Sequence, residues 1–297
     1  MTGSFLPVWM LPVLASALGL GFYDIFKKHA VRDNAVMPAL FFSTLSGSVV
    51  FLLITCCMGE IGQYLQCTHY EKLLIGVKSL LVAGSWTCVF YAMRELPISI
   101  ATPIRASSPV WTFIASLLLY MEIPNWIEGL GMLVIFGGFY LFSVFGNQEG
   151  FSFRKSKGML LIVLGTLIGS CCAICDKYLL GVLKIPPRTV QFYFSIYLVV
   201  IFGITWLVRS FFGQKRPFQF RWSVPLAGVM LILSDMLYFY SLSLPGTYVS
   251  FISLVRRCSC IVAFAAGVIF FKEKNIKRKA VAMGLILLGV LLLALGH

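Results

Sequence analysis

Two arginines of this 297-residue chain stand inside long apolar stretches, where a charge is costly. Arg105 lies in TPIRASSPVW, and Arg256 lies in SLVRRCSC. An arginine at the centre of a bilayer costs roughly 2.5 to 3.5 kcal/mol on insertion scales. Its planar guanidinium can bind a carboxylate or phosphate through two hydrogen bonds. A bound anion would therefore offset much of the cost.

Hydroxyl and further cationic groups lie close to these arginines in the sequence. Ser108 and Ser259 each follow an arginine by three residues, which places both groups on one face of a helix. Tyr91 and Tyr240 lie just upstream, in VFYAMRELP and YFYSLSLP. We expect the hydroxyls to add hydrogen bonds to a ligand, although packing is the commoner role of aromatic residues in apolar spans. Arg257 is turned about 100° from its neighbour, so it is a weaker candidate for direct contact.

Three aspartates, Asp24, Asp176 and Asp235, also fall within apolar stretches. They are candidate partners of the arginines in purely structural ion pairs. Alternatively, a buried carboxylate could carry a coupling proton, and Asp235, in LILSDMLYFY, is the most central of the three. The sequence leaves these two roles open.

The residue types that hold metals or act as nucleophiles form no convincing set. Cys172 and Cys175 make one isolated CxxC inside an apolar span, where cysteine behaves as a small apolar residue. The three histidines, His29, His69 and His297, fall in loops or at the terminus. We therefore expect no metal, no cofactor and no enzymatic activity.

The composition is that of a membrane protein. The chain is 59% hydrophobic and 12% charged, against about 25% charged residues in soluble domains. Its mean hydropathy is +0.92. Apolar runs of about 20 residues recur along the chain, as expected of membrane-spanning helices. They predict an all-α integral membrane protein with ten spans, at about 6–27, 35–58, 74–93, 98–120, 126–146, 157–181, 189–212, 223–242, 247–271 and 276–296.

An internal repeat relates the two halves. At a constant offset of 151 residues, Arg105 matches Arg256, Ser108 matches Ser259 and Glu122 matches Glu273; Phe113, Ala115, Met132, Ile135 and Gly138 match in the same way. Residues 1–148 and 157–297 are thus predicted to form two five-helix repeats. Because five is odd, the second repeat is inverted, an arrangement typical of alternating access around a site near the midplane.

The net charge of +13 lies mostly in short loops between the spans. Nucleic acid binding is not expected, because lysine and arginine in such loops set topology and meet lipid headgroups. The loops after odd-numbered spans carry most of the cations. The opposite loops hold little beyond Lys72, Lys78, Lys184 and Arg188, and Lys28 and Lys177 are expected to be interfacial anchors. The positive-inside rule predicts a cytoplasmic or inner cell membrane protein with both termini outside.

The chain resembles the drug/metabolite transporter superfamily, in its EamA-type branch. The resemblance covers nearly the whole chain and rests on ten spans in two halves and on two stretches, LPISIATPIRASSPVWTFIASLLLYMEIPNWIEGLGMLVIFGGFYLF and LPGTYVSFISLVRRCSCIVAFAAGVIFFKEKNIKRKAVAMGLILLGVLLL. Family members end spans four and nine with an acidic residue, here Glu122 and Glu273. Plastid sugar-phosphate carriers of the superfamily hold phosphate with basic residues on those spans. This sequence differs by an arginine on span four where they use lysine.

The resemblance implies a secondary carrier, and the chain has no G-x-x-x-x-G-K-[ST] motif for nucleotide hydrolysis. The arginines point to a small organic anion bearing a carboxylate or phosphate, moved by alternating access. The alternatives are an exporter of amino acids or amphipathic metabolites and a flippase of a lipid-linked sugar. A non-transporting membrane scaffold is the least favoured. The expected partners are a small molecule and the lipid bilayer, and the sequence leaves monomer and homodimer open.

Overall fold

The computed structural model describes residues 10–59, 61–64, 67–108, 110–111, 125–148, 156–211, 217–244, 255–271 and 275–296. Glu122 and Glu273, and with them Pro109, Phe113, Ala115 and His297, lie outside these ranges. All ten expected spans have helical residues at their predicted places, and the described residues contain helices without strands.

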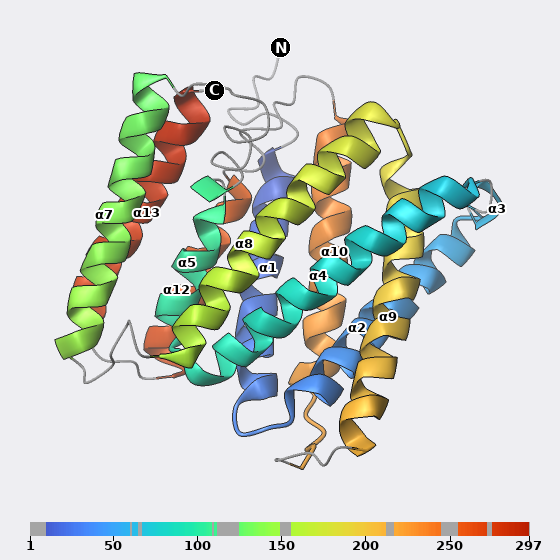
Figure 1. Cartoon of the computed structure of the whole chain (residues 1–297), viewed down its shortest axis with the longest axis horizontal. Coiled ribbons are helices and arrows are strands. Elements are labelled where there is room, and N and C mark those ends of the chain that lie inside the picture. Colours follow the sequence, from blue (N-terminus) through green and yellow to red (C-terminus); the bar gives the residue numbers. More distant parts are fainter. Residues whose placement is uncertain are drawn as a thin grey trace. The chain divides into compact units, whose positions relative to one another are not determined.

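The first half contributes six described helices (Figure 1). They are α1 (Met10–Val31), α2 (Val36–Cys57), the short α3 (Ile61–Tyr64), α4 (His69–Glu95), α5 (Ile98–Ala106) and α7 (Trp126–Gln148). The start of α4 is fixed by a capping box, in which Thr68 and Glu71 each accept a hydrogen bond from the other's backbone N–H. Leu96, which leads into Pro97, ends the helix, because a residue before proline is disfavoured in helical conformation.

The second half repeats this order. It contains α8 (Lys157–Lys177), continued by the π-helical turn η1 (Tyr178–Val182), then α9 (Pro187–Phe211), α10 (Ser223–Ser243), α12 (Ser259–Ile269) and α13 (Ile276–Gly296). By length and hydropathy, α1, α2, α4, α8, α9 and α10 could each cross a membrane. Spans four and nine are described only in part, as α5 and α12 with the few residues beside them.

The contact between α7 and α13 shows how the two halves are related (Figure 1). A Cβ at Gly138 would lie 2.7 Å from Cγ1 of Ile286, and a Cβ at Gly289 would lie 2.5 Å from Cγ1 of Ile135. Each residue of one contact is 151 positions from its equivalent in the other. The same glycine–isoleucine contact therefore occurs twice, with the roles of the two helices exchanged, as at an interface with two-fold symmetry. Because the partner's number falls as the residue number rises, the helices are antiparallel, as an inverted repeat requires.

Smaller features repeat at nearly the same offset. The hydroxyl of Ser85 on α4 donates to the carbonyl of Gly165 on α8, and Ser16 on α1 donates to the carbonyl of Ser234 on α10, both at 2.7 Å. The two pairs occupy positions 149 residues apart, Ser85 with Ser234 and Ser16 with Gly165, and donor and acceptor are exchanged between them. Asp33 and Lys184, 151 residues apart, both adopt positive φ, 55° and 53°. The expected all-helical fold built as inverted repeats is therefore confirmed.

The described contacts group the chain into two compact units, each drawn from both halves. Unit 1 comprises residues 1–25, 97–156 and 233–297, and it contains α5, α7, α12 and α13. Unit 2 comprises residues 26–96 and 157–232, and it contains α2, α4, α8 and α9. Helices α1 and α10 contribute to both. The division of the sequence at 1–148 and 157–297 stays a prediction.

Candidate functional site

Both arginines predicted as ligands lie in unit 1, and each contacts a carboxylate from a different helix. Nη1 of Arg105 donates to Oδ1 of Asp24 on α1 at 3.0 Å. Nη2 of Arg256 donates to Oδ1 of Asp235 on α10 at 2.5 Å. Two of the three aspartates proposed as partners therefore contact arginines. A guanidinium has five N–H donors, so one bond to a carboxylate leaves others for a ligand.

Each arginine immediately precedes an interruption of its helix. Helix α5 ends at Ala106, and Ser107 closes it with bonds to the carbonyls of Pro103 and Ile104. In the second half, the N–H of Cys258 donates to Val255, and a turn at Cys258 precedes α12. Ser107 and Cys258 are 151 residues apart, and the bonds Val110 N–H to Ser107 and Ile261 N–H to Cys258 are equivalent, at 3.0 and 2.9 Å. Interrupted helices in both repeats are typical of transporter binding sites.

Arg256 makes an unusual set of contacts. The ring of Tyr238, three residues after Asp235 on α10, lies 4.3 Å from the guanidinium carbon of Arg256. The Nε of Arg256 is buried and, among the described residues, has no hydrogen-bond acceptor. A buried donor without an acceptor is costly, so this N–H is a natural contact for a ligand oxygen.

The two ion pairs belong to one electrostatic group. Tyr23 is within electrostatic range of Arg105, Asp24 and Asp235, and Arg257 is within range of Arg256 and Arg105. We refer to Arg105, Arg256, Arg257, Asp24 and Asp235 as the arginine cluster. Its formal charges are three positive and two negative, so a single negative charge would neutralise it.

Close helix contacts position the carboxylates of the cluster. A Cβ at Gly21 on α1 would lie 3.2 Å from the carbonyl oxygen of Ser259, so a glycine lets α1 approach the start of α12. Asp24 follows Gly21 by one turn. The bond from Ser16 to Ser234 joins α1 to α10 immediately before Asp235. The same helices that contact each other therefore carry both carboxylates toward the arginines.

The other predicted ligand residues lie in different surroundings. Ser108 and Ser259 are both partly buried in unit 1, and Ser108 lies beyond the turn that ends α5. Tyr240 is 56% exposed, whereas Tyr238 contacts the guanidinium. Tyr91 lies in unit 2, where its ring is 5.1 Å from the guanidinium carbon of Arg94 and 5.2 Å from that of Arg209.

The third aspartate also lies in unit 2. Asp176 on α8 forms an ion pair with Lys78 on α4. The assignment of Lys78 to a loop is wrong, because it lies inside α4 and is buried. The residues that sequence analysis missed are thus Lys78 and Tyr238. Spacing could have identified Tyr238, because three residues after Asp235 is the same helix face, while five residues after it is not.

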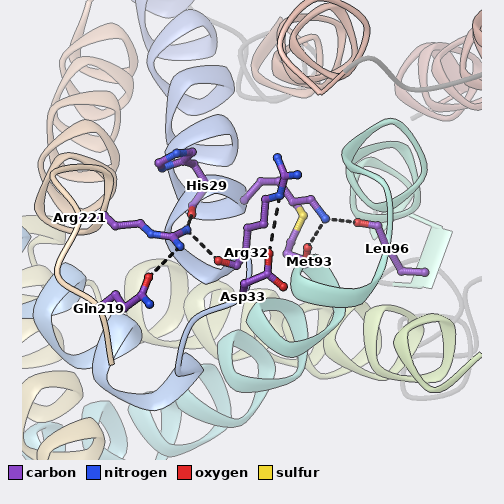
Figure 2. A network of polar contacts seen from close by, with 8 residues as sticks. His29, Arg32, Asp33, Met93, Leu96, Gln219 and Arg221 are labelled. Carbon is purple, nitrogen blue, oxygen red and sulfur yellow. Dashed lines mark hydrogen bonds and ion pairs between the residues drawn. The ribbon is translucent and has the colours of Figure 1, made fainter. Parts of the chain in front are cut away.

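Cations near the ends of α1 and α4 bind main-chain carbonyls instead of ligands (Figure 2). Nζ of Lys28 donates to the carbonyls of Met93 and Leu96 at 2.7 and 2.5 Å. Arg221 donates to those of His29 and Arg32 at 2.9 and 2.7 Å, and Figure 2 shows it between α1 and Gln219. Lys28 was expected to be an interfacial anchor, but it is buried and satisfies the last carbonyls of α4.

The described residues contain no group of three or more histidine, cysteine, aspartate or glutamate side chains that could hold a metal. The arrangement in unit 1 is instead suited to binding an anion, since it combines guanidinium groups with a stacked phenol and interrupted helices.

Comparison with known proteins gives matches to transporters and to one solved structure. Residues 7–144 match the EamA-like transporter family. The chain is 23% identical over 288 residues to a protein of Archaeoglobus fulgidus named "Uncharacterized transporter", covering 96% of this chain and 98% of that protein. A solved crystal structure matches with a TM-score of 0.60 at 16% identity, covering 97% of this chain and 95% of the other, which supports the fold.

The helical fold, the inverted repeat and these matches lead to one conclusion. Over residues 7–144 the chain is similar to the EamA-like transporter family, and its long apolar helices are those of a multi-pass membrane protein.

Proposed function

We propose that this transporter is a secondary carrier of a small organic anion, bearing a carboxylate or a phosphate, and that the arginine cluster binds it. The observation that carries the proposal is the position of Arg105 and Arg256 directly before mirrored helix interruptions. A guanidinium buried in a membrane protein is costly. Retaining one in each repeat is readily understood if both act on a ligand.

The charges of the cluster support an anion more than a cation. The aspartates compensate two of its three arginines, and one positive charge remains. A carboxylate or phosphate could accept hydrogen bonds from Nε of Arg256 and from the guanidinium of Arg105, which has five N–H donors. The ring of Tyr238 stacks on Arg256 and would hold its guanidinium plane in place for this contact.

Alternating access is the expected mechanism because the repeats are inverted. Such halves can exchange conformations, so that a site between equivalent helices opens first to one side and then to the other. The helix interruptions beside the arginines provide places where the backbone can bend without breaking a continuous ladder of hydrogen bonds.

The second candidate is an exporter of amino acids, and one observation favours it. Asp24 and Asp235 hold carboxylates next to the arginines. A zwitterion could place its carboxylate on a guanidinium and its ammonium on an aspartate.

A thermal-shift screen of the purified protein separates these candidates. The probes are malate, phosphoenolpyruvate and glycerol 3-phosphate as anions, leucine and glutamine as zwitterions, and spermidine as a cation. The proposal predicts that at least one anion raises the melting temperature and that the rise disappears in Arg105→Gln/Asp24→Asn and in Arg256→Gln/Asp235→Asn. These double variants remove both charges of each ion pair together.

Arg278→Gln is the matched control. Arg278 is also in unit 1, but it lies over the ring of Phe145, 5.9 Å from the centroid, at the start of α13. The stabilisation should persist in this variant. Stabilisation by zwitterions alone would establish the second candidate, and stabilisation by spermidine alone would reject both.

A further inference from the structure

The ion pair between Lys78 and Asp176 is a charged site that the arginine cluster does not use. It lies in unit 2 between α4 and α8. Lys78 is nine residues into α4, which is about 13 Å along the helix axis. The side chain of Lys78 is 10% exposed, and that of Asp176 is 37% exposed. The carboxylate is therefore accessible from one side, while the ammonium is buried.

The two helices do not need this pair to stay together. Ser85 donates to the carbonyl of Gly165 at 2.7 Å, and a Cβ at Gly165 would lie 2.9 Å from Cγ2 of Val89. Close contact and interhelical hydrogen bonds of this kind are what hold membrane helices together. A buried ion pair, by contrast, is often no more stabilising than apolar residues of similar size. Its presence therefore favours a role other than packing.

The repeat supports this distinction. Residues equivalent to Asp176 and Lys78, at the offset of 149 that relates Ser85 to Ser234, are Lys27 and Ala227. The hydrogen bond of Ser85 thus has a counterpart in the mirrored helix pair, whereas the ion pair has none. It is an addition to one copy of a shared scaffold.

The described groups near Asp176 come from three helices. From α4 it faces Lys78, and from α8 the thiols of Cys171, Cys172 and Cys175 lie in electrostatic range of the group. From α9 the ring of Phe194 lies 4.8 Å from Nζ of Lys78, with the phenols of Tyr193 and Tyr197 in the adjoining core. Oδ1 of Asp176 is buried against the ammonium but has no hydrogen bond of regular geometry.

A lysine partner gives this pair a property that the arginine pairs lack. Arginine keeps its proton at physiological pH, so a protonated aspartate beside it leaves a positive charge that cannot be discharged. Buried lysine can release its proton. The Lys78–Asp176 pair can therefore take up one proton on the carboxylate and return to neutrality by releasing one from the ammonium.

The backbone after Asp176 is also unusual. The turn η1 begins at Tyr178, and the N–H of Leu183 bonds to the carbonyl of Tyr178, five residues earlier, at 3.0 Å. Turns of this type inside helices occur frequently at functional sites. A change of charge at Asp176 thus lies next to a segment whose hydrogen bonding is already irregular.

We infer that Asp176, paired with Lys78, is the residue that binds the coupling proton of the carrier, separately from the arginine cluster. The inference rests on the proposed function for its coupling, but not for the proton site. A proton from the aqueous phase adds to the carboxylate of Asp176, and Lys78 releases its own proton to the opposite side, which leaves both groups neutral. Transfer of the proton from Asp176 to Lys78 then restores the ion pair.

Infrared difference spectroscopy of the protein in liposomes tests the proton site without a substrate. Acidification should produce a carboxylic acid band in the wild type, in Asp24→Asn and in Asp235→Asn. The band should be lost in Asp176→Asn and in Lys78→Gln/Asp176→Asn, the double variant guarding against misfolding. A band that persists in both overturns the inference. If the band is lost in Asp235→Asn instead, the proton site lies in the arginine cluster, and this result also overturns the inference.

Proton uptake tests the coupling. Proteoliposomes with a pH-sensitive dye inside receive an acid-outside gradient together with malate, phosphoenolpyruvate and glycerol 3-phosphate. Anion-dependent acidification should be lost in Asp176→Asn, while stabilisation by the anion is retained. Lys78→Arg keeps the ion pair and should keep the melting temperature, but it should slow the uptake. Unchanged uptake in Lys78→Arg overturns the role of Lys78.

The two proposals can fail separately. Absence of any anion effect in the wild type, with the Asp176 band intact, rejects the proposed function and supports the proton site. An anion effect that depends on the arginines, with no Asp176 band, supports the proposed function and rejects the proton site.

Discussion

The α7–α13 contact and the arginine cluster both lie in unit 1. The helix contact follows the internal repeat, whereas the ion pairs of the cluster do not. In the helix contact, Gly138 and Gly289 each lie against the isoleucine of the other helix, so both halves make the same interaction. In the arginine cluster, the helix interruptions of the two repeats are equivalent, but the aspartates that pair with the two arginines are not. Arg105 contacts Asp24 from the helix of span one, whereas Arg256 contacts Asp235 from the helix of span eight.

The difference arises because equivalent positions carry other residue types. The position equivalent to Asp24 is Ala173, and the position equivalent to Asp235 is Trp86. Neither can supply a carboxylate. Packing therefore follows the two-fold relation, since it depends on backbone shape and small residues. Charge compensation departs from it, so the two arginines are chemically distinct despite their matching backbones.

The largest expected effect comes from removing one arginine. Arg105→Gln should destabilise the protein by about 3 to 5 kcal/mol, because it removes the cationic partner of the buried carboxylate of Asp24. Arg256→Gln should cost less, because Asp235 is 26% exposed and Asp24 is 9% exposed. Thermal unfolding in detergent measures the difference.

A restored charge balance provides the control. Arg105→Gln/Asp24→Asn should recover most of the stability lost in the single variant. Equal losses for the two single variants would show that the pairs are equivalent after all, and would remove the asymmetry described above.

Overpacking the mirrored helix contact should have a similar effect in both halves. Gly138→Val and Gly289→Val should each cost about 1 to 3 kcal/mol, because a Cβ would lie 2.7 and 2.5 Å from the opposite isoleucine. Neighbouring glycines on the same helices are matched controls. A Cβ at Gly137 or Gly284 has no atom within 4 Å, so Gly137→Ala and Gly284→Ala should leave the melting temperature nearly unchanged.

A loss confined to one of the two valine variants would contradict the two-fold contact. Protein yield after size-exclusion chromatography, measured beside the melting temperature, separates a misassembled variant from one that is folded but weaker.

The stacking of Tyr238 on Arg256 should have a smaller effect. Tyr238→Leu should lower stability by roughly 0.5 to 2 kcal/mol through loss of the cation–π contact. Tyr240→Leu should be close to neutral, because Tyr240 is 56% exposed. Chemical denaturation of both variants decides between them, and a larger loss for Tyr240→Leu would assign the aromatic contact to the wrong residue.

The smallest effects are expected for the interhelical serine bonds. Ser85→Ala and Ser16→Ala each remove one hydrogen bond to a carbonyl, at a cost of about 0.6 kcal/mol in membrane proteins. Because the two bonds join equivalent positions, with donor and acceptor exchanged, the losses should be similar. A difference well above this magnitude would indicate that only one of the bonds is important.

The positions of the helices could be predicted from the sequence because apolar length and loop charge determine them directly. The predicted spans 35–58 and 276–296, for example, correspond to α2 at Val36–Cys57 and α13 at Ile276–Gly296. The inverted repeat could also be predicted, since Arg105 and Arg256 share an offset with Glu122 and Glu273. Pairing of the arginines with aspartates was one of the roles considered.

Other features depend on three-dimensional contacts that hydropathy does not encode. The interruption at Cys258 has no proline beside it, so nothing in the local sequence marks it, although its equivalent at Ser107 lies near Pro109. Lys78 was counted with loop cations because a lysine usually lies in a loop. Its burial depends on Asp176, which is distant in sequence and approaches only when α4 and α8 come together.

The carbonyl contacts of Lys28 and Arg221 bear on how the folded protein meets its lipids. A cation that neutralises the negative end of a helix has little charge left for phosphate headgroups. Attraction to an anionic leaflet must then come from cations at the surface, such as the exposed Arg209. The raw excess of lysine and arginine thus overstates the surface potential that this protein presents to its bilayer.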